Sequence, residues 1–484
     1  MSGTTAALVG FGAMLLMIAF RAPIGLALLL VGGVGYGILS SPTALFGYMK
    51  SNAYHQFANY TLSVIPLFIL MGALAERAGI ASALFKSAER VIGRARGGLA
   101  MAVIGACTAF GAICGSSVAT TATFGRAALP ELLKYRYNPG FSTGTIAVGG
   151  TLGILIPPSV ILVVYAIQTE QNIKKLFQAA VIPGLLAALF YCLTIAYVVW
   201  RKPELAPKSD VKVEDHAPPN AILKWLARIA GVAILGLGLA GVLTGKLSYA
   251  DAVIFWLAGV LIAIVDLTIM PAILIAILVV GGINNGWFTP TEGAAVGAIA
   301  MMLIGFATRK LSLKDVGEAI RQTAETSGMI FIILLGAEVF GAFLSLTSLP
   351  TTAAEAIGAL GYSPYVVLIA MLAFYILLGA VMDELAMILL TLPVFFPIIE
   401  ALDFGFPSDE VAVWFGILVL MVVGIGLTAP PIGLNVFVIS AIARGVPISE
   451  TYRGVLPFIV ADIIRLILVI AFPALALWLV RLLN

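Results

Sequence analysis

The sequence predicts an all-α integral membrane protein built from two similar halves. Of its 484 residues, 61% are hydrophobic and only 11% are charged, whereas a soluble domain carries about 25% charged residues. Apolar runs that can cross the roughly 30 Å hydrocarbon core recur along the chain and correspond to about 12 to 14 transmembrane helices. Two matching runs each contain a proline pair, Pro157 with Pro158 and Pro430 with Pro431. Paired interruptions of this kind are typical of the central site of a transporter.

Composition and motifs argue against several other classes. The formal net charge is only +3, and the basic residues are spread between apolar runs, so nothing indicates nucleic-acid binding. The sequence has no GxxxxGK[ST] phosphate loop and no HExxH motif, which argues against an ATPase and a metalloprotease. Cys107, Cys114 and Cys192 lie in apolar segments without neighbouring His or Cys ligands, and we interpret them as small core residues. We expect no catalytic residue and no cofactor other than a coupling ion.

Residues 1–64 are expected to form N-terminal scaffold helices. The first apolar run, 6–20, has no basic n-region and no clear cleavage site, so we expect it to be retained as a span. Residues 65–200 form the predicted first repeat, which contains a span, an amphipathic arm, a polar-lined hairpin at 114–132 and a broken helix at 141–168. The break is expected because a proline pair inside a helix removes backbone hydrogen bonds and clashes with the preceding turn.

The amphipathic arm of the first repeat covers residues 76–98. Its apolar and basic residues recur at helical spacing on different faces, which predicts a helix lying along the membrane surface in contact with lipid. The apolar face holds Ile80, Leu84, Ala88, Val91 and Ile92, and the basic face holds Lys86, Arg90 and Arg94.

The second half follows a similar order after a polar linker. Residues 201–222 are rich in proline and alternating charge, which predicts an unstructured connection. Residues 223–328 are expected to hold further scaffold helices and a second amphipathic arm at 311–328. Residues 329–484 form the predicted second repeat, with a hairpin at 379–399 and a broken helix at 411–442. The weak similarity leaves open whether the repeats are parallel or inverted, and we expect inverted repeats.

Hydroxyl side chains crowd the first hairpin. Lipid cannot satisfy hydroxyls or unwound backbone, so such a segment must face protein or a water-filled cavity. This favours a binding role for the cluster. The alternative is that the hydroxyls bond to carbonyls of their own helix or join neighbouring helices. The cluster consists of Ser116, Ser117, Thr120, Thr121 and Thr123.

Asp383 and Glu384 are the only acids in the apolar stretch 365–399. A carboxylate at membrane depth is costly unless it is paired, hydrated or bound to a cation, so it indicates a functional site. We favour Asp383 as the functional acid. The alternative is that both acids lie at a solvated end of the hairpin.

The two helix breaks are expected to expose backbone carbonyl oxygens. Together with one carboxylate, these oxygens are suitable ligands for a hard cation such as Na⁺. Unwound carbonyls of broken helices commonly coordinate coupling ions, and the two halves would each supply one set of ligands. The second-half set combines Asp383 with the chain around Gly379 and the second break, while the first-half set relies on hydroxyls and carbonyls. The predicted sodium-binding residues are Ser116, Ser117, Thr151, Gly153, Pro157, Gly379, Asp383, Gly426, Thr428 and Pro430.

An anionic solute is the expected cargo. Half-helices that begin after each proline pair, near Ser159 and Asn435, offer positive dipole ends to an anion. Arg126 follows the hydroxyl cluster and could pair with a substrate carboxylate, or instead anchor the hairpin to lipid headgroups or to Glu131. The predicted substrate-binding residues are Ser117, Thr121, Thr123, Arg126, Ser159 and Asn435.

A membrane-embedded hydrolase using Ser116 or Ser117 is a competing hypothesis. Such an enzyme needs a histidine among its spans. The only histidines are His55, before the second span, and His216, in the polar linker. The sequence therefore gives poor support for a nucleophilic serine.

At these motifs the chain resembles the large membrane subunit, the M or DctM-type permease, of tripartite ATP-independent periplasmic (TRAP) transporters. The matching segments are CGSSVATTATFGRAALPEL, GGTLGILIPPSVILVVYAI with KKLFQAAVIPGLL, DELAMILLTLPVFFPII and LTAPPIGLNVFVISAI. The resemblance covers nearly the whole chain. The chain departs from the family pattern at two places. Residues 201–265 make it longer than a typical member, and Arg126 stands where we expect a small or neutral residue.

The resemblance implies an elevator-type transporter of the bacterial inner membrane with Na⁺ coupling. It also implies two partners, a small four-helix membrane subunit of the Q type and a periplasmic solute-binding protein of the P type. Ser116 and Ser117 would belong to the first re-entrant hairpin and Asp383 to the second. The predicted function is Na⁺-coupled uptake of an organic acid, such as a dicarboxylate, delivered by the binding protein. The alternative is a stand-alone Na⁺/organic anion symporter.

Overall fold

The computed structural model describes residues 3–93, 95–207, 274–359 and 361–483, and every regular element in these ranges is a helix. Six described helices are long and apolar enough to cross a membrane, or seven if the bent pair at Pro139–Leu155 and Val160–Gln168 is one span; six further apolar helices have 10 to 17 residues. The prediction of an all-α membrane protein is confirmed. Several apolar runs that the sequence suggests as spans are arms of hairpins or half-helices. Residues 208–273, which hold most of the predicted linker at 201–222 and part of the predicted scaffold segment at 223–328, lie outside the described residues.

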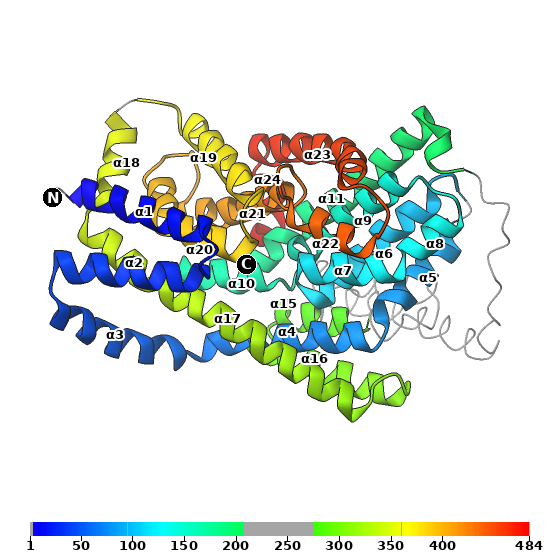
Figure 1. Cartoon of the computed structure of the whole chain (residues 1–484), viewed down its shortest axis with the longest axis horizontal. Helices are drawn as coiled ribbons and strands as arrows, with labels where there is room; N and C mark the ends of the chain where they lie inside the picture. Colours follow the sequence, from blue (N-terminus) through cyan, green and yellow to red (C-terminus); the bar gives the residue numbers. More distant parts are fainter. Residues whose placement is uncertain (1–2, 94, 208–273, 360, 484) are drawn as a thin grey trace, which may run out of the picture.

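The N-terminal helices pack with α17 into one group, which we call the frame. In Figure 1, α1, α2 and α3 lie beside the long helix α17, and α4 and α16 lie close to its other half. A Cβ atom on Gly32 of α2 would lie 2.6 Å from the backbone nitrogen of Phe340 in α17, so the two helices approach closely. The frame consists of α1 (Gly3–Ala19), α2 (Ile24–Leu39), α3 (Pro42–Phe57), η1 (Tyr60–Ser63), α4 (Val64–Arg77), η3 (Ile277–Gly281), α15 (Gly282–Asn284), α16 (Pro290–Ala307), α17 (Leu313–Leu346) and α18 (Leu349–Ala359).

The second amphipathic arm does not form a separate element. A capping box between Ser312 and Asp315 starts α17, which then continues for 34 residues to Leu346. This single helix merges the predicted arm at 311–328 with the following span. The prediction missed the merger because a change from polar to apolar composition does not by itself end a helix, which needs a Gly, a Pro or a cap.

The first arm forms the helix α5 (Ile80–Ile92), which begins after Gly79 in the left-handed region, at φ +67°. Ile80 and Leu84 are buried, whereas Lys86 and Arg90 are exposed, as the amphipathic pattern predicts. Val91 and Ile92, which share the apolar face by spacing, are exposed. The arm therefore packs against the protein only along its first three turns.

Two hairpins lie in the remaining group of helices. The first joins α6 (Gly98–Cys114) to α7 (Ser117–Ala127) through two residues, and Phe110 of one arm contacts Phe124 of the other with ring centroids 5.7 Å apart. The second joins α19 (Pro364–Gly379) to α20 (Glu384–Glu400), and the Thr391 hydroxyl donates to the Tyr375 hydroxyl at 2.6 Å. The predicted hairpins at 114–132 and 379–399 thus cover the tip and second arm only. Their first arms are too apolar to distinguish from spans by sequence.

Both proline pairs break helices, as predicted. The first lies between α9 (Pro139–Leu155) and α10 (Val160–Gln168), which meet at 44°. The second lies between α21 (Ser408–Gly426) and α22 (Leu434–Ile442). Each pair is joined by a cis peptide bond. The remaining helices of this group are α8 (Leu129–Lys134), α11 (Ile173–Arg201), η2 (Pro203–Leu205), α23 (Ile448–Ala471) and α24 (Ala474–Leu483).

Corresponding helices of the two repeats run in opposite directions. Helix α11 starts beside Asp409, because its Lys175 contacts the Asp409 carboxylate at 3.1 Å. The segment that follows its last residue lies beside Asn138, whose backbone N–H donates to the Leu205 carbonyl. Helix α23 starts at the Asn138 end, where a Cβ atom on Gly140 would touch Glu450, and finishes beside α21, where Trp414 donates to the Val469 carbonyl. The repeats are therefore inverted.

Candidate functional site

The first hairpin tip lies against the first helix break. Gly115 adopts φ +64°, and Ser116 caps α7 by accepting from the Ala119 backbone N–H at 3.4 Å. A Cβ atom on Gly153 would lie 2.6 Å from both the Ser116 carbonyl oxygen and the Thr120 hydroxyl oxygen. Only glycine at this position allows the tip to approach α9 so closely. The structure thus brings together the predicted first-half ligands Ser116 and Gly153.

The second hairpin tip lies against the second break in the same manner. The Ala380 carbonyl accepts from the backbone N–H groups of Ile432 and Gly433, both at 3.2 Å. A Cβ atom on Gly426 would lie 2.7 Å from the backbone of Gly379. Gly379 and Gly426 are therefore in contact, as the predicted second-half set requires.

The hydroxyls of Thr151 and Thr428 form hydrogen bonds to backbone carbonyls of their own helices or helix ends. The Thr151 hydroxyl donates to the Val148 carbonyl at 2.7 Å and lies 3.1 Å from the Tyr191 hydroxyl. The Thr428 hydroxyl lies 3.0 Å from the Ile425 carbonyl. Thr151 points toward α11 and not toward the first hairpin tip, so its side chain is separated from Ser116. In the hydroxyl cluster of the first hairpin, the Thr120 hydroxyl likewise donates to the Ser116 carbonyl at 2.7 Å, as the back-bonding alternative expects for that residue.

Asp383 is the N-cap of α20. One carboxylate oxygen accepts from the Leu385 and Ala386 backbone N–H groups at 3.1 and 3.0 Å. A carboxylate has two oxygens and about four lone-pair sites. Capping therefore still leaves acceptor capacity for a cation beside the tip.

Glu384 is the acid that joins the two hairpins. The Ser117 hydroxyl donates to its carboxylate at 2.6 Å, and both residues are buried. Sequence reasoning preferred Asp383 and did not assign this contact. The sequence does contain a signal for this arrangement. Asp is a favoured N-cap and Glu is favoured in the first turn of a helix, so Asp383 is expected to cap α20 and Glu384 to lie in its first turn. Glu384 is not at a solvated hairpin end, since it is only 9% exposed, whereas Asp383 is partly exposed.

Three buried polar atoms near the crossing of the repeats have no hydrogen-bond partner among the described residues. They are the hydroxyl oxygens of Thr121 and Ser159 and the amide oxygen of Asn435, and all three residues are fully buried. The Asn435 amide nitrogen donates to the Ala147 carbonyl of α9 at 3.2 Å, which links α22 to the first repeat. An unsatisfied buried polar group costs about 1–3 kcal/mol. These atoms are suited to a polar ligand held between the repeats.

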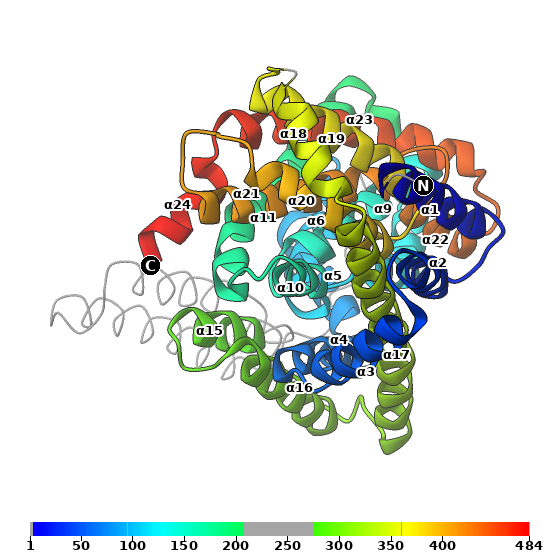
Figure 2. The ribbon, with the colours of Figure 1, turned by 90° about the vertical axis from the view of Figure 1, so that its left-hand side faces the viewer.

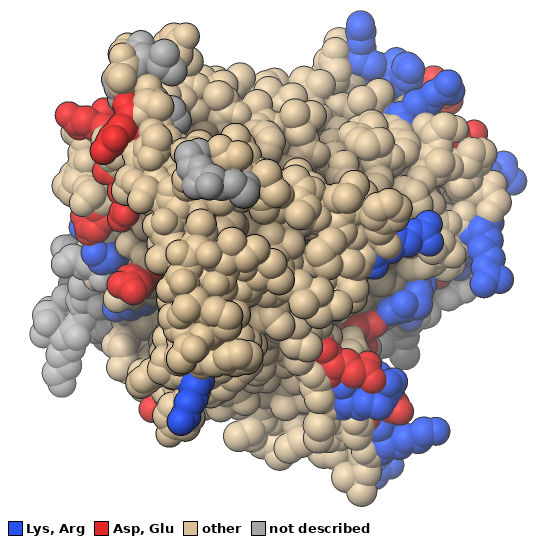
Figure 3. Space-filling view, turned by 60° about the vertical axis from the view of Figure 1, so that its left-hand side comes forward, with Lys and Arg blue, Asp and Glu red and all other residues tan. Residues whose placement is uncertain are grey.

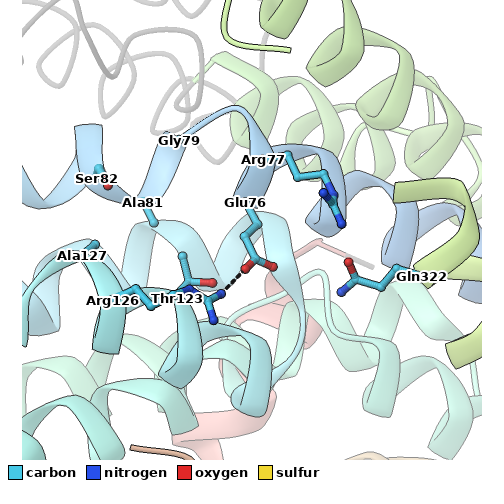
Figure 4. A pocket seen from close by; sticks show the side chains of 9 residues that line it. All are labelled: Glu76, Arg77, Gly79, Ala81, Ser82, Thr123, Arg126, Ala127 and Gln322. Atoms are coloured by element: carbon cyan, nitrogen blue, oxygen red, sulfur yellow. Dashed lines mark hydrogen bonds and ion pairs between the residues drawn. The ribbon is translucent and has the colours of Figure 1, made fainter. Parts of the chain in front are cut away.

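Thr123 and Arg126 lie on another face of α7. They line a pocket of about 370 Å³ together with Glu76 and Arg77 of α4 (Figure 4). Arg126 forms an ion pair with Glu76, and not with Glu131. The structure therefore separates these two predicted substrate residues from Ser117, Thr121, Ser159 and Asn435.

The described residues contain no group of three or more His, Cys, Asp or Glu side chains that could hold a metal ion. Ser117 has a carboxylate partner, and His55 lies on the exposed helix α3. His216 lies outside the described residues. The structure shows no hydrogen bond between a histidine and Ser116 or Ser117 in the part of the chain that it describes.

Replacement of Ser117 by alanine is expected to reduce solute uptake about tenfold or more, because a hydrogen bond to a charged group is worth about 1.5–3 kcal/mol. Cys114, at the same tip and also buried, provides the matched control: Cys114→Ala should leave uptake close to that of the unmodified protein. Initial uptake rates in proteoliposomes measure both. Equal losses would favour packing as the role of the tip.

The comparisons with known proteins agree over most of the chain. Residues 11–475 match the family model described as the tripartite ATP-independent periplasmic transporter, DctM component. The C4-dicarboxylate TRAP transporter large permease protein DctM of Pseudomonas aeruginosa is 34% identical over 420 residues, which cover 87% of this chain and 86% of the relative. The sialic acid TRAP transporter large permease protein SiaM of Vibrio cholerae is 26% identical and 93% of each chain is covered.

A solved structure shows the same fold. The YdaH transporter of Alcanivorax borkumensis superposes with a TM-score of 0.59 at 17% identity, and the match covers 96% of this chain and 98% of that one. The relatives are permease proteins and not enzymes, so the hydrolase hypothesis is wrong. The chain therefore belongs to the DctM component family of the tripartite ATP-independent periplasmic transporters.

Proposed function

We propose that the chain is the transport subunit of a TRAP system and carries an organic acid into the cell by symport with Na⁺. The observation that carries this proposal is the pairing of each hairpin tip with one helix break, at Ser116 with Gly153 and at Gly379 with Gly426. Broken helices with exposed carbonyls and half-helix ends suit a coupling cation and an anionic solute. The proposed cation ligands are the predicted sodium-binding residues other than Thr151, whose side chain points toward α11, with Asp383 supplying the carboxylate.

The described helices divide into the frame and a second group that contains both hairpins. This division is consistent with an elevator movement of the hairpins past the frame. The Arg126–Glu76 ion pair links α7 of the first hairpin to α4 of the frame. An exposed ion pair contributes little to stability, about 0–1 kcal/mol, so it can break when the two groups move. In this proposal the central polar atoms of Thr121, Ser159 and Asn435 travel with the hairpins and contact the solute.

The names of relatives support an organic acid as the solute class. C4-dicarboxylate and sialic acid permeases are among them, although one relative is an ectoine permease of Halomonas elongata. We propose a small Q-type membrane subunit and a periplasmic binding protein as partners, because the family is tripartite by description.

The charge distribution supports an orientation in the bacterial inner membrane. Lys134, Arg136, Arg201 and Lys202 lie at the end of the molecule where α9 begins. At the opposite end, beside the base of the second hairpin, Lys175 and Arg481 are each paired with an acid, Asp409 and Glu410. In Figure 3, Lys and Arg gather mainly along the right-hand edge of a face whose middle is almost free of charge. Cytoplasmic loops carry excess Lys and Arg, so the end at which α9 begins is proposed to be cytoplasmic.

Reconstitution tests the proposal. Proteoliposomes that contain the chain and its small subunit should accumulate the solute only when a Na⁺ gradient and the loaded binding protein are both present, because the tripartite mechanism needs both. Replacing Na⁺ by choline, or omitting the binding protein, provides the controls. Uptake by this chain alone would overturn the tripartite assignment in favour of a stand-alone symporter.

A further inference from the structure

A second pocket, distant from the hairpin tips, lies where α9 and α23 begin and α11 ends. It has a volume of about 440 Å³. The backbone N–H of Asn138 donates to the Leu205 carbonyl at 2.9 Å, which ties the start of α9 to the chain that follows α11. Figures 1 and 2 show the green end of α11 projecting near the upper edge of the molecule. The pocket is therefore built from three segments that are far apart in sequence.

The lining of this pocket carries a net positive charge. Arg201, Lys202 and Arg453 line it, and Glu450 is the only acid among its lining residues. None of these four side chains forms an ion pair with a residue that the structure describes. Three unpaired cations facing one acid leave a net positive charge at a site that can accept an anion.

The remaining lining is apolar and aromatic. Phe141, Val198, Leu205 and Pro457 contribute to it, and Tyr197 lies at its edge with 59% of its surface exposed. Tyrosine is enriched where a membrane protein crosses from hydrocarbon to headgroups. A ligand with a negative head and an apolar body matches both parts of the pocket, whereas a small inorganic anion matches only the first.

We infer that this pocket binds the headgroup of an anionic phospholipid, with Arg201, Lys202 and Arg453 contacting the phosphate and the apolar wall contacting the glycerol and upper acyl chain. Basic pockets between membrane helices on the cytoplasmic side are suited to such lipids, and the cytoplasmic placement of this pocket rests on the orientation proposed above. The site joins α11 of the first repeat to α23 of the second, so a bound lipid stabilises the inverted pair. Binding is independent of solute transport and of the proposed Na⁺ coupling.

Lipid retention by the full-length chain in an uncharged detergent tests this inference. Phosphatidylglycerol, phosphatidylcholine and inorganic phosphate are titrated separately, and binding is measured by native mass spectrometry and by thermal stability. The unmodified protein should retain phosphatidylglycerol in preference to phosphatidylcholine. Equal stabilisation by inorganic phosphate alone would overturn the lipid assignment.

Charge variants locate the site. A double variant, Arg201→Gln with Arg453→Gln, should bind phosphatidylglycerol about thirtyfold more weakly, because each basic residue near the surface contributes about a fivefold factor. The matched control, Arg309→Gln with Arg444→Gln, removes two exposed cations outside the pocket and should leave binding unchanged. Equal losses in the two double variants would contradict the proposal.

A variant that is expected to bind phosphatidylglycerol more tightly distinguishes an electrostatic effect from a folding defect. Glu450→Gln removes the only acid of the pocket lining and should tighten phosphatidylglycerol binding about fivefold. Arg201→Lys with Arg453→Lys keeps the charge and should retain most of the binding. Weaker binding by Glu450→Gln would overturn the electrostatic basis of the site.

Discussion

Asp383→Asn is expected to abolish Na⁺-driven uptake while leaving the protein folded. Asparagine retains the oxygen that accepts from Leu385 and Ala386, and Asn and Asp are nearly equivalent N-caps. The change therefore keeps the cap but removes the negative charge and replaces the second carboxylate oxygen by an NH2 group, which cannot bind a cation. Removing one partner of a buried charge pair costs about 3–5 kcal/mol, which corresponds to a Na⁺ affinity about hundredfold or more weaker. The Na⁺ concentration for half-maximal uptake and the melting temperature measure the two effects separately.

Asp403 provides the matched control for this variant. It is also an aspartate whose carboxylate accepts from a backbone N–H, that of Gly405 at 2.8 Å, but it is exposed and lies outside the hairpin tip. Asp403→Asn should leave the Na⁺ dependence unchanged. If Asp383→Asn also keeps the original Na⁺ dependence, Asp383 is only a helix cap and has no part in ion coupling.

Gly426→Ala is expected to have the second large effect, because it separates the second hairpin tip from the second break. The added Cβ would lie 2.7 Å from the Gly379 carbonyl carbon and 3.1 Å from the Ala380 nitrogen. These are backbone atoms, which cannot rotate away as a side chain does. Overpacking of this kind typically costs about 1–3 kcal/mol. We expect a lower melting temperature and loss of uptake.

Gly105→Ala is the control, because a Cβ at Gly105 of α6 meets no atom within 4 Å. Alanine also favours a helix over glycine by about 0.5–1 kcal/mol, so this variant should be as stable as the unmodified protein or slightly more so. Uptake by Gly426→Ala at the rate of Gly105→Ala would show that the close contact between tip and break is unnecessary.

The prominent features of the fold were predictable from particular residues. The proline pairs forbid a continuous helix, and the structure breaks α9 and α21 at these pairs. The apolar composition correctly indicated membrane helices. The order of hairpin and broken helix in each half correctly indicated a repeat, and the antiparallel course of α11 and α23 shows that the repeats are inverted.

The details that sequence reasoning missed depend on tertiary contacts. The first arms of both hairpins are as apolar as spans, so only the turns at Gly115 and Ala380 reveal them. The contact between Ser117 and Glu384 joins residues 267 positions apart, which no local pattern encodes. Thr123 and Arg126 follow Thr121 closely in sequence, yet helical rotation places them in the pocket beside Glu76.

Simultaneous measurement of labelled Na⁺ and labelled solute entry into the same proteoliposomes tests the central claim most directly. The vesicles contain the chain with its partner subunits and start without a Na⁺ gradient. The account predicts that addition of the solute-loaded binding protein drives Na⁺ inward together with the solute, and that Asp383→Asn abolishes both fluxes. Solute entry with no accompanying Na⁺ entry would contradict the account.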